Sequence, residues 1–253
     1  MNASKSPPGQ ERWTTWHSLA MLLCALASWC LGDVRALAIA GALSLVVLLV
    51  LGASRWTETR TLGAANAITL VRVVLVVAIA WVPAGPVAAL VVLSVLALDG
   101  LDGWMARHFR TASAFGAKFD METDALLVAV VCLKLGIEGR LGPWILVPGL
   151  LRYAYALGIR VVMVRAEAPR SQFGRYVFVV LVLCLALSLW PIEPIHRPLS
   201  MLVTALTVYS FARSFFAMRG RWGSGARSAA VGDRMRSPES QSGGVTRGAR
   251  SSA

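Results

Sequence analysis

The chain has 253 residues, of which 57% are hydrophobic and only 15% are charged, and its mean hydropathy is +0.64. A soluble domain carries roughly 25% charged residues, so this composition excludes a soluble globular protein and predicts a membrane protein. The net charge of +12 lies mainly between apolar stretches. It therefore indicates membrane topology and contact with anionic lipid, and we expect no nucleic-acid partner.

Apolar stretches of about 17 to 23 residues follow one another along the chain, and such lengths cross roughly 30 Å of hydrocarbon as helices. We count about eight, at 17–32, 34–53, 66–83, 86–106, 116–137, 142–164, 174–190 and 198–217. The first follows Lys5 and Arg12 as a secretory signal would, but a second apolar run comes directly after it. The sequence therefore favours a span there, and an all-α, polytopic transmembrane helical bundle overall.

Positive charge predicts how the bundle is threaded, because Lys and Arg gather in cytoplasmic loops. With the N-terminus inside, 18 of the 25 Lys and Arg residues lie in the cytoplasmic segments 1–16, 54–65, 107–118, 160–175 and 219–253. This favours a multi-pass protein of the inner (plasma) membrane with both termini in the cytoplasm. Residues 219–253 are rich in Gly, Ser and Arg, which predicts a disordered basic tail.

Several charged side chains lie inside the apolar stretches, where each would cost roughly 2.5 to 3.5 kcal/mol at mid-bilayer. Lys134 and Arg213 have long side chains near helix ends, which favours anchoring at the membrane surface. For Arg72 and Arg152 a polar cavity and a structural role remain equally open. Aspartates are too short to reach the surface in this way, so they are the functional candidates.

The aspartates fall on two helical faces. The first face carries Asp99, Asp102, Gly103, Ala106 and Arg107, and the second carries Gly116, Asp120 and Asp124. The short turn around 108–115 makes the two helices antiparallel neighbours, so both faces can meet at the cytoplasmic membrane surface. Glu122 is off the second face, and we leave it out of the predicted site.

Four carboxylates this close repel one another by roughly 4 kcal/mol per close pair at an effective dielectric constant near 20, so a cation has to lie among them. Oxygen ligands without histidine or cysteine predict a hard ion, Mg²⁺ or Mn²⁺, and four acids can hold two ions. Such a pair suits a diphosphate and in-line displacement at phosphorus. Gly103 and Ala106 would leave room for a bulky ligand, and Arg107 would supply a cation for phosphate.

Residues 99–124 fit the pattern D-x-x-D-G-x-x-A-R-x8-G-x3-D-x3-D at every fixed position. This stretch resembles the signature of the CDP-alcohol phosphotransferases, also called CDP-alcohol phosphatidyltransferases. Asn66, Thr69 and Arg72 are similar to the family's N-x-x-T-x-x-R element. The resemblance covers 56–218 and implies a six-helix membrane domain, which leaves 1–16 as a cytoplasmic tail and 17–55 as two added helices.

The resemblance also implies roles for individual residues. Asp99 and Asp120 would bridge two metal ions, and Asp102 and Asp124 would each bind one. Asp124 would also be the general base that takes the proton from the acceptor hydroxyl. The residues implied in binding the CDP-linked donor are Asn66, Thr69, Gly103, Ala106, Arg107 and Ser113. The acceptor oxygen would displace CMP from CDP-diacylglycerol in phospholipid biosynthesis, and family members form homodimers.

The acceptor is less defined. Arg152, Arg170 and Arg175 offer cations beside the site, which suits a phosphorylated acceptor such as glycerol 3-phosphate or an inositol phosphate. The positive-inside rule predicts similar charges, so serine, free inositol, an aminoalcohol and another phospholipid stay open. An ion-coupled transporter would need acids near mid-membrane and two related halves, which the sequence lacks. A catalytically silent scaffold is disfavoured by the intact aspartates.

Overall fold

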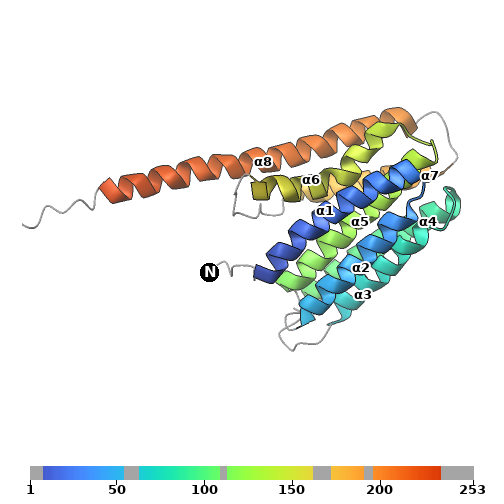
Figure 1. Ribbon diagram of the computed structural model, residues 1–253, viewed down its shortest axis with the longest axis horizontal. Coiled ribbons are helices and arrows are strands. Elements are labelled where there is room, and N and C mark those ends of the chain that lie inside the picture. The colour runs from blue at the N-terminus through green and yellow to red at the C-terminus, as the bar shows by residue number, and fades with distance from the viewer. Residues whose placement is uncertain (1–7, 54–62, 109–112, 162–171, 191–195, 235–253) are drawn as a thin grey trace, which may run out of the picture.

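The protein is described here by a computed structural model that covers residues 8–53, 63–108, 113–161, 172–190 and 196–234. Across these residues the chain is helical and contains no strand, which confirms the predicted all-α polytopic bundle (Figure 1). The α-helices are α1 (Pro8–Leu31), α2 (Arg35–Leu51), α3 (Gly63–Ile79), α4 (Pro86–His108), α5 (Ala114–Ile137), α6 (Leu146–Val161), α7 (Gln172–Leu189) and α8 (His196–Arg234). A short 3₁₀-helix, η2 (Pro143–Ile145), precedes α6.

Each of the eight predicted apolar stretches corresponds to one of these helices. Among the described residues, four helices are both long and apolar enough to cross a membrane, through Arg12–Leu31, Pro86–Met105, Gln172–Leu189 and Arg197–Phe216. The helices α2 and α3 are apolar but have only 17 residues each, slightly short of the roughly 20 that span a bilayer. The four long helices identify a membrane protein.

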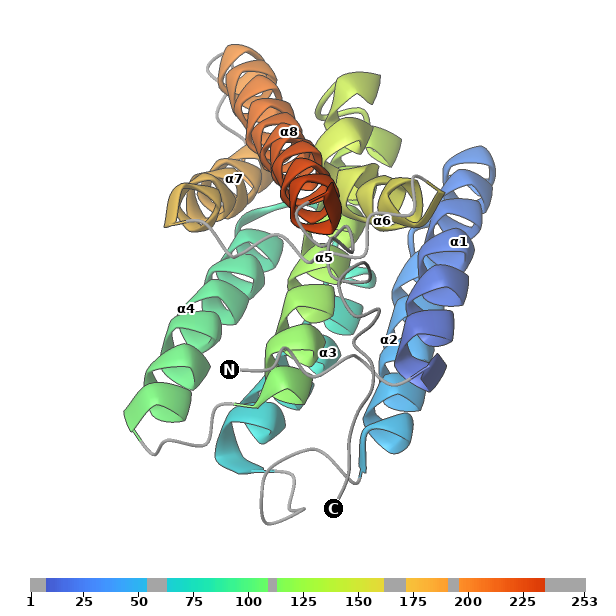
Figure 2. The ribbon, with the colours of Figure 1, turned by 90° about the vertical axis from the view of Figure 1, so that its left-hand side faces the viewer.

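Helix α5 lies at the centre of the bundle (Figure 2) and contacts α1, α2, α3, α6 and α7. Every side chain from Ala125 to Leu135 is buried, and all of them are apolar except Lys134, which pairs with Glu138 at 2.6 Å. A glycine lets α6 approach closely, because a Cβ atom at Gly149 would lie 2.9 Å from the Cβ of Cys132. The apolar part of α5 therefore forms the centre of the core.

The first turn of α5 is fixed by an N-cap. Ser113 has an extended backbone, and its hydroxyl oxygen accepts a hydrogen bond of 2.9 Å from the backbone N–H of Gly116. Such a cap satisfies one of the free N–H groups at a helix start. The cap defines where α5 begins, and with it the positions of Asp120 and Asp124 about two and three turns later.

Contacts between distant segments define the two ends of the bundle. At one end, the ammonium group of Lys118 in α5 donates a 2.7 Å hydrogen bond to the hydroxyl of Thr14 in α1. At the other end, the guanidinium of Arg35 lies 5.8 Å from the ring centre of Trp81. The starts of α1 and α5 therefore share one end, which agrees with the predicted threading. The membrane side that this end faces stays a prediction.

Helix α8 is 39 residues long and projects past the other helices (Figure 1). The sequence predicts a disordered tail from Arg219, but the helix continues to Arg234. Glycine, a weak helix former, is as frequent in 219–234 as arginine, so helix propensity alone does not account for the difference. The rest of the predicted tail, 235–253, lies outside the described residues.

Candidate active site

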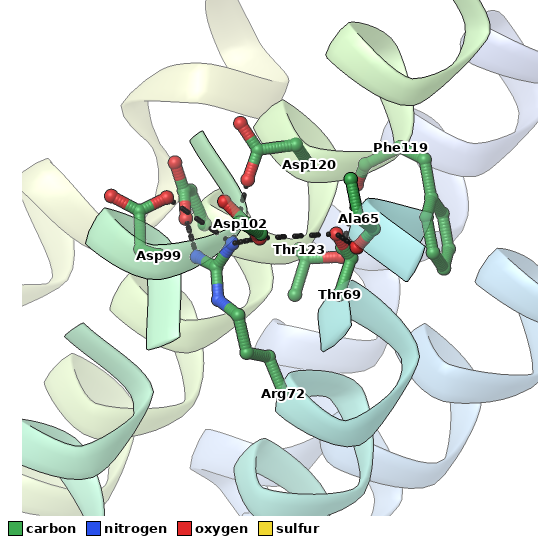
Figure 3. A network of polar contacts seen from close by, with 9 residues as sticks. Ala65, Thr69, Arg72, Asp99, Asp102, Phe119, Asp120 and Thr123 are labelled. Carbon is green, nitrogen blue, oxygen red and sulfur yellow. Dashed lines mark hydrogen bonds and ion pairs between the residues drawn. The ribbon is translucent and has the colours of Figure 1, made fainter. Parts of the chain in front are cut away.

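The four aspartates of the signature come from two adjoining helix ends. Asp99 and Asp102 lie in the last three turns of α4, and Asp120 and Asp124 lie in the first three turns of α5. Asp99, Asp120 and Asp124 each offer a carboxylate oxygen within 4.8 Å of the others. Asp102 faces the same centre (Figure 3). The structure therefore brings together the two acidic faces that the sequence predicts. The sequence also predicts that the two helices are antiparallel neighbours, but within the described residues α4 and α5 do not pack along each other, and each packs against α3 instead.

The guanidinium of Arg72, from the middle of α3, lies at the centre of this cluster (Figure 3). One of its terminal nitrogens lies 3.1 Å from Asp99, 3.0 Å from Asp102 and 2.6 Å from Asp120. The other terminal nitrogen is paired with Asp124. The Arg72 side chain is only 1% exposed. The sequence leaves a polar cavity and a structural role open for Arg72. These contacts place the Arg72 guanidinium in polar surroundings.

Two further polar residues of α3 line the same region. The Thr69 hydroxyl lies 3.2 Å from a carboxylate oxygen of Asp102 and donates a 3.1 Å hydrogen bond to the backbone carbonyl of Ala65. Asn66 approaches α5 closely, because a Cβ atom at Gly116 would lie 2.8 Å from its side-chain oxygen. Gly116, the glycine of the signature, thus makes room for Asn66 beside the aspartates.

The other residues predicted to bind the donor surround this centre less completely. Gly103 is half-buried on α4, one residue after Asp102. Ser113 caps α5, so its hydroxyl already has a structural role. Ala106 and Arg107 belong to α4, but their side chains lie outside the described ones. A donor-binding role for these four residues stays a prediction.

Two of the three arginines predicted to bind the acceptor, Arg152 and Arg175, are among the described residues. Arg152 of α6 donates a 2.7 Å hydrogen bond to Glu122 of α5 and keeps 20% of its side chain exposed. Arg175, in the first turn of α7, is exposed and within electrostatic range of Asp99. Arg170 lies outside the described residues. An acceptor site formed by these arginines therefore stays a prediction.

Glu122 and His17 form a polar contact that the sequence does not predict. The second carboxylate oxygen of Glu122 lies 3.9 Å from His17 in α1. The other ring nitrogen of His17 lies 2.7 Å from the hydroxyl of Ser44 in α2. His17 also stacks on Trp13, with ring centres 4.5 Å apart. The position of a histidine inside an apolar stretch was the one sign in the sequence of a polar partner for His17. Which partners it has depends on how α1 packs against α5 and α6.

The arrangement matches the chemistry of one known family. The sequence profile of the CDP-alcohol phosphatidyltransferases matches residues 62–211, which is more than half of the chain. Searches of curated proteins and of solved structures found no match. Members of the family transfer phosphatidyl groups in phospholipid synthesis and generally depend on a divalent metal. The profile covers α3 to α7 and the first part of α8, and it includes all four aspartates. The chain therefore belongs to the CDP-alcohol phosphatidyltransferase family.

Proposed function

We propose that the protein transfers a phosphatidyl group from CDP-diacylglycerol to an acceptor hydroxyl and releases CMP. The acceptor oxygen forms a bond to the phosphorus that carries the diacylglycerol. The bond between this phosphorus and the bridging oxygen of CMP breaks, and the hydroxyl proton passes to a carboxylate of the protein. The convergence of the four signature aspartates at one point of the bundle carries the proposal.

A pair of divalent ions, Mg²⁺ or Mn²⁺, fits this donor set. The four ionised carboxylates contribute −4 and Arg72 contributes +1, so a charge of −3 is left uncompensated among the residues in contact. We propose that Asp99, Asp102, Asp120 and Asp124 would hold these ions. When bound, such ions neutralise the diphosphate and stabilise the charge on the attacking and leaving oxygens.

The remaining chemistry falls to the side chains. Asp124 is the proposed general base, because the family resemblance implies this role and because Asp124 directly precedes the buried segment of α5 that begins at Ala125. Asn66, Thr69 and Ser113 are proposed to contact the CDP-linked donor from the facing side, at the starts of α3 and α5. From α4 we propose Gly103, Ala106 and Arg107.

The acceptor is proposed to be a phosphorylated alcohol, such as glycerol 3-phosphate or an inositol phosphate. Arg175 supports this choice because it is exposed and close enough to Asp99 to interact with it electrostatically. A guanidinium binds phosphate through two parallel hydrogen bonds, which suits an acceptor with its own phosphate group. Arg152 and Arg170 are proposed to contribute from α6 and from the segment before α7.

The test is an acceptor screen with the purified protein in lipid nanodiscs. Radiolabelled CDP-diacylglycerol and Mg²⁺ or Mn²⁺ are supplied with glycerol 3-phosphate, an inositol phosphate, inositol, serine or phosphatidylglycerol, and CMP and the lipid product are measured. We expect CMP release with a phosphorylated acceptor. A neutral acceptor as the preferred substrate would overturn the acceptor assignment, and no CMP release with any of them would overturn the reaction.

A matched pair of variants tests the base. Asp124→Asn keeps the size of the side chain but cannot take a proton, so we expect loss of CMP release from a folded protein. Asp33→Asn is the control, because Asp33 is exposed in the turn between α1 and α2. Its carboxylate accepts a 2.9 Å hydrogen bond from the backbone N–H of Arg35, which an asparagine side-chain oxygen can also accept. Retained turnover in Asp124→Asn would remove Asp124 from the base role.

We also propose that 56–218 is the catalytic membrane domain, that 17–55 is an addition to it, and that the protein is a homodimer in the inner (plasma) membrane. The active site would face the cytoplasm. Labelling of single cysteines in intact and opened cells tests the orientation. Mass measurement of the protein released in native nanodiscs tests the dimer.

A further inference from the structure

Arg72 has no part in the roles proposed so far, although it makes more charged contacts than any other described side chain. It comes from α3, whereas the four aspartates come from α4 and α5, so this one side chain joins three helices. Its side chain is 1% exposed. A buried arginine costs several kcal/mol of desolvation unless its partners compensate for it. Its position is therefore maintained by the carboxylates themselves.

The hydrogen bonds at Arg72 do not match what the aspartates can accept. One terminal nitrogen has two hydrogens but three carboxylates within 3.1 Å. The hydrogen bonds go to Asp102 and Asp120, while Asp99 has only the ion-pair contact. The Nε–H group of the same guanidinium is buried and has no partner. The terminal nitrogen thus has too few hydrogens for the carboxylates around it, while the Nε–H group still has a hydrogen to donate.

A divalent cation would need carboxylates that Arg72 now contacts. Asp99, Asp120 and Asp124 are the described residues whose oxygens are close enough to share an ion, and all three contact this guanidinium. A guanidinium and a metal cation at such distances also repel each other, more strongly in the interior of the protein than in water. Arg72 and the cation therefore compete for the aspartates.

We infer that Arg72 is a displaceable counter-cation, which leaves the aspartates and binds the diphosphate of the CDP-linked donor when the donor enters. The inference rests on the proposed function. A diphosphate offers oxygens in the spacing that a guanidinium fork matches, including an acceptor for the free Nε–H group. The released carboxylates are then available to the divalent cation. Donor and cation therefore each favour the binding of the other, through the movement of Arg72 as well as through direct contact between the diphosphate and the cation.

The test measures metal binding without turnover. Mn²⁺ is titrated into the protein in nanodiscs and detected by electron paramagnetic resonance, in the presence and absence of CDP. Coupling between two sites is typically about 5- to 150-fold. In Arg72→Met the competitor is gone, so we expect the dissociation constant for Mn²⁺ without CDP to fall by about tenfold or more. We also expect CDP to change it less than in the unaltered protein.

Arg35→Met is the matched control, since it removes the same charge and the same kind of side chain at the opposite end of the bundle. It should leave Mn²⁺ affinity and the effect of CDP unchanged. Unchanged or weaker Mn²⁺ binding in Arg72→Met would overturn the inference. That result is expected if Arg72 only supports the structure of the site, whereas the loss of a competing cation must strengthen Mn²⁺ binding. Equal tightening in both variants would do the same, because it would show a general charge effect.

Arg72→Lys covers the case in which Arg72→Met does not fold. Lysine keeps the charge but lacks the planar fork, so it cannot contact four carboxylates in the same way. We expect Arg72→Lys to bind Mn²⁺ more tightly than the unaltered protein, but less tightly than a site from which the competing cation is removed completely. If Arg72→Lys binds Mn²⁺ no more tightly than the unaltered protein, the inference is overturned. The proposed function is judged separately, by CMP release from CDP-diacylglycerol in the unaltered protein, so the two can fail independently.

Discussion

The Glu122–Arg152 pair gives a quantitative prediction about how α5 and α6 are held together. Only 2% of the Glu122 side chain and 20% of the Arg152 side chain is exposed, and their atoms lie 2.7 Å apart. Removing one partner of a buried pair costs about 3 to 5 kcal/mol, because a buried charge is left uncompensated. The partial exposure of Arg152 places the expected cost of Glu122→Gln near the lower value.

At roughly 2 to 4 °C per kcal/mol for a chain of this size, 3 kcal/mol lowers the melting temperature by about 6 to 12 °C. The assay is a double-mutant cycle of Glu122→Gln, Arg152→Met and the double variant, followed by thermal unfolding in detergent. We expect the double variant to be more stable than the sum of the two single effects predicts, by about 0.5 to 3 kcal/mol. Additive effects would refute the conclusion that the two side chains compensate each other.

Three further changes test other parts of the structure. Ser113→Ala removes the cap of α5 and should lower the stability by about 1 kcal/mol. Ser113→Asp should largely restore the melting temperature. If Ser113→Ala loses no stability, Ser113 does not stabilise α5 as a cap. Gly149→Val places a branched side chain against Cys132, so we expect about 1 to 3 kcal/mol of destabilisation, again from thermal unfolding; an unchanged melting temperature would show that α5 and α6 can separate. Chelation with EDTA should abolish CMP release and added Mg²⁺ or Mn²⁺ should restore it, and full turnover in EDTA would contradict a divalent-metal site.

The aspartate cluster could be predicted from sequence because only local rules were needed. The 3.6-residue period places Asp120 and Asp124 on one face, and a short turn makes neighbouring helices antiparallel. The position of Arg72 needed more. It depends on where α3 packs relative to α4 and α5 and on which way a long, flexible side chain points, and neither follows from spacing.

The contacts of the added helices could not be predicted for a similar reason. Glu122 is correctly described as lying off the face of the aspartates, but its partners come from α1 and α6, which are far away in sequence. The end of α8 differs from the prediction for another reason. Composition indicates whether a segment can form a core, but it does not determine where a helix that begins in the core will end.

The burial of α5 has a consequence for how a lipid reaches the aspartates. Its side chains are enclosed from Ala125 to Leu135, so Asp120 and Asp124 belong to a helix that has little freedom to shift. Asp99 and Asp102 belong to α4, which exposes large side chains such as Leu90, Leu101 and Trp104 on its outer surface. A donor with two acyl chains in contact with α4 would therefore lie beside Asp99 and Asp102. The four signature carboxylates thus combine a pair on an enclosed helix with a pair on a helix that has an apolar outer surface.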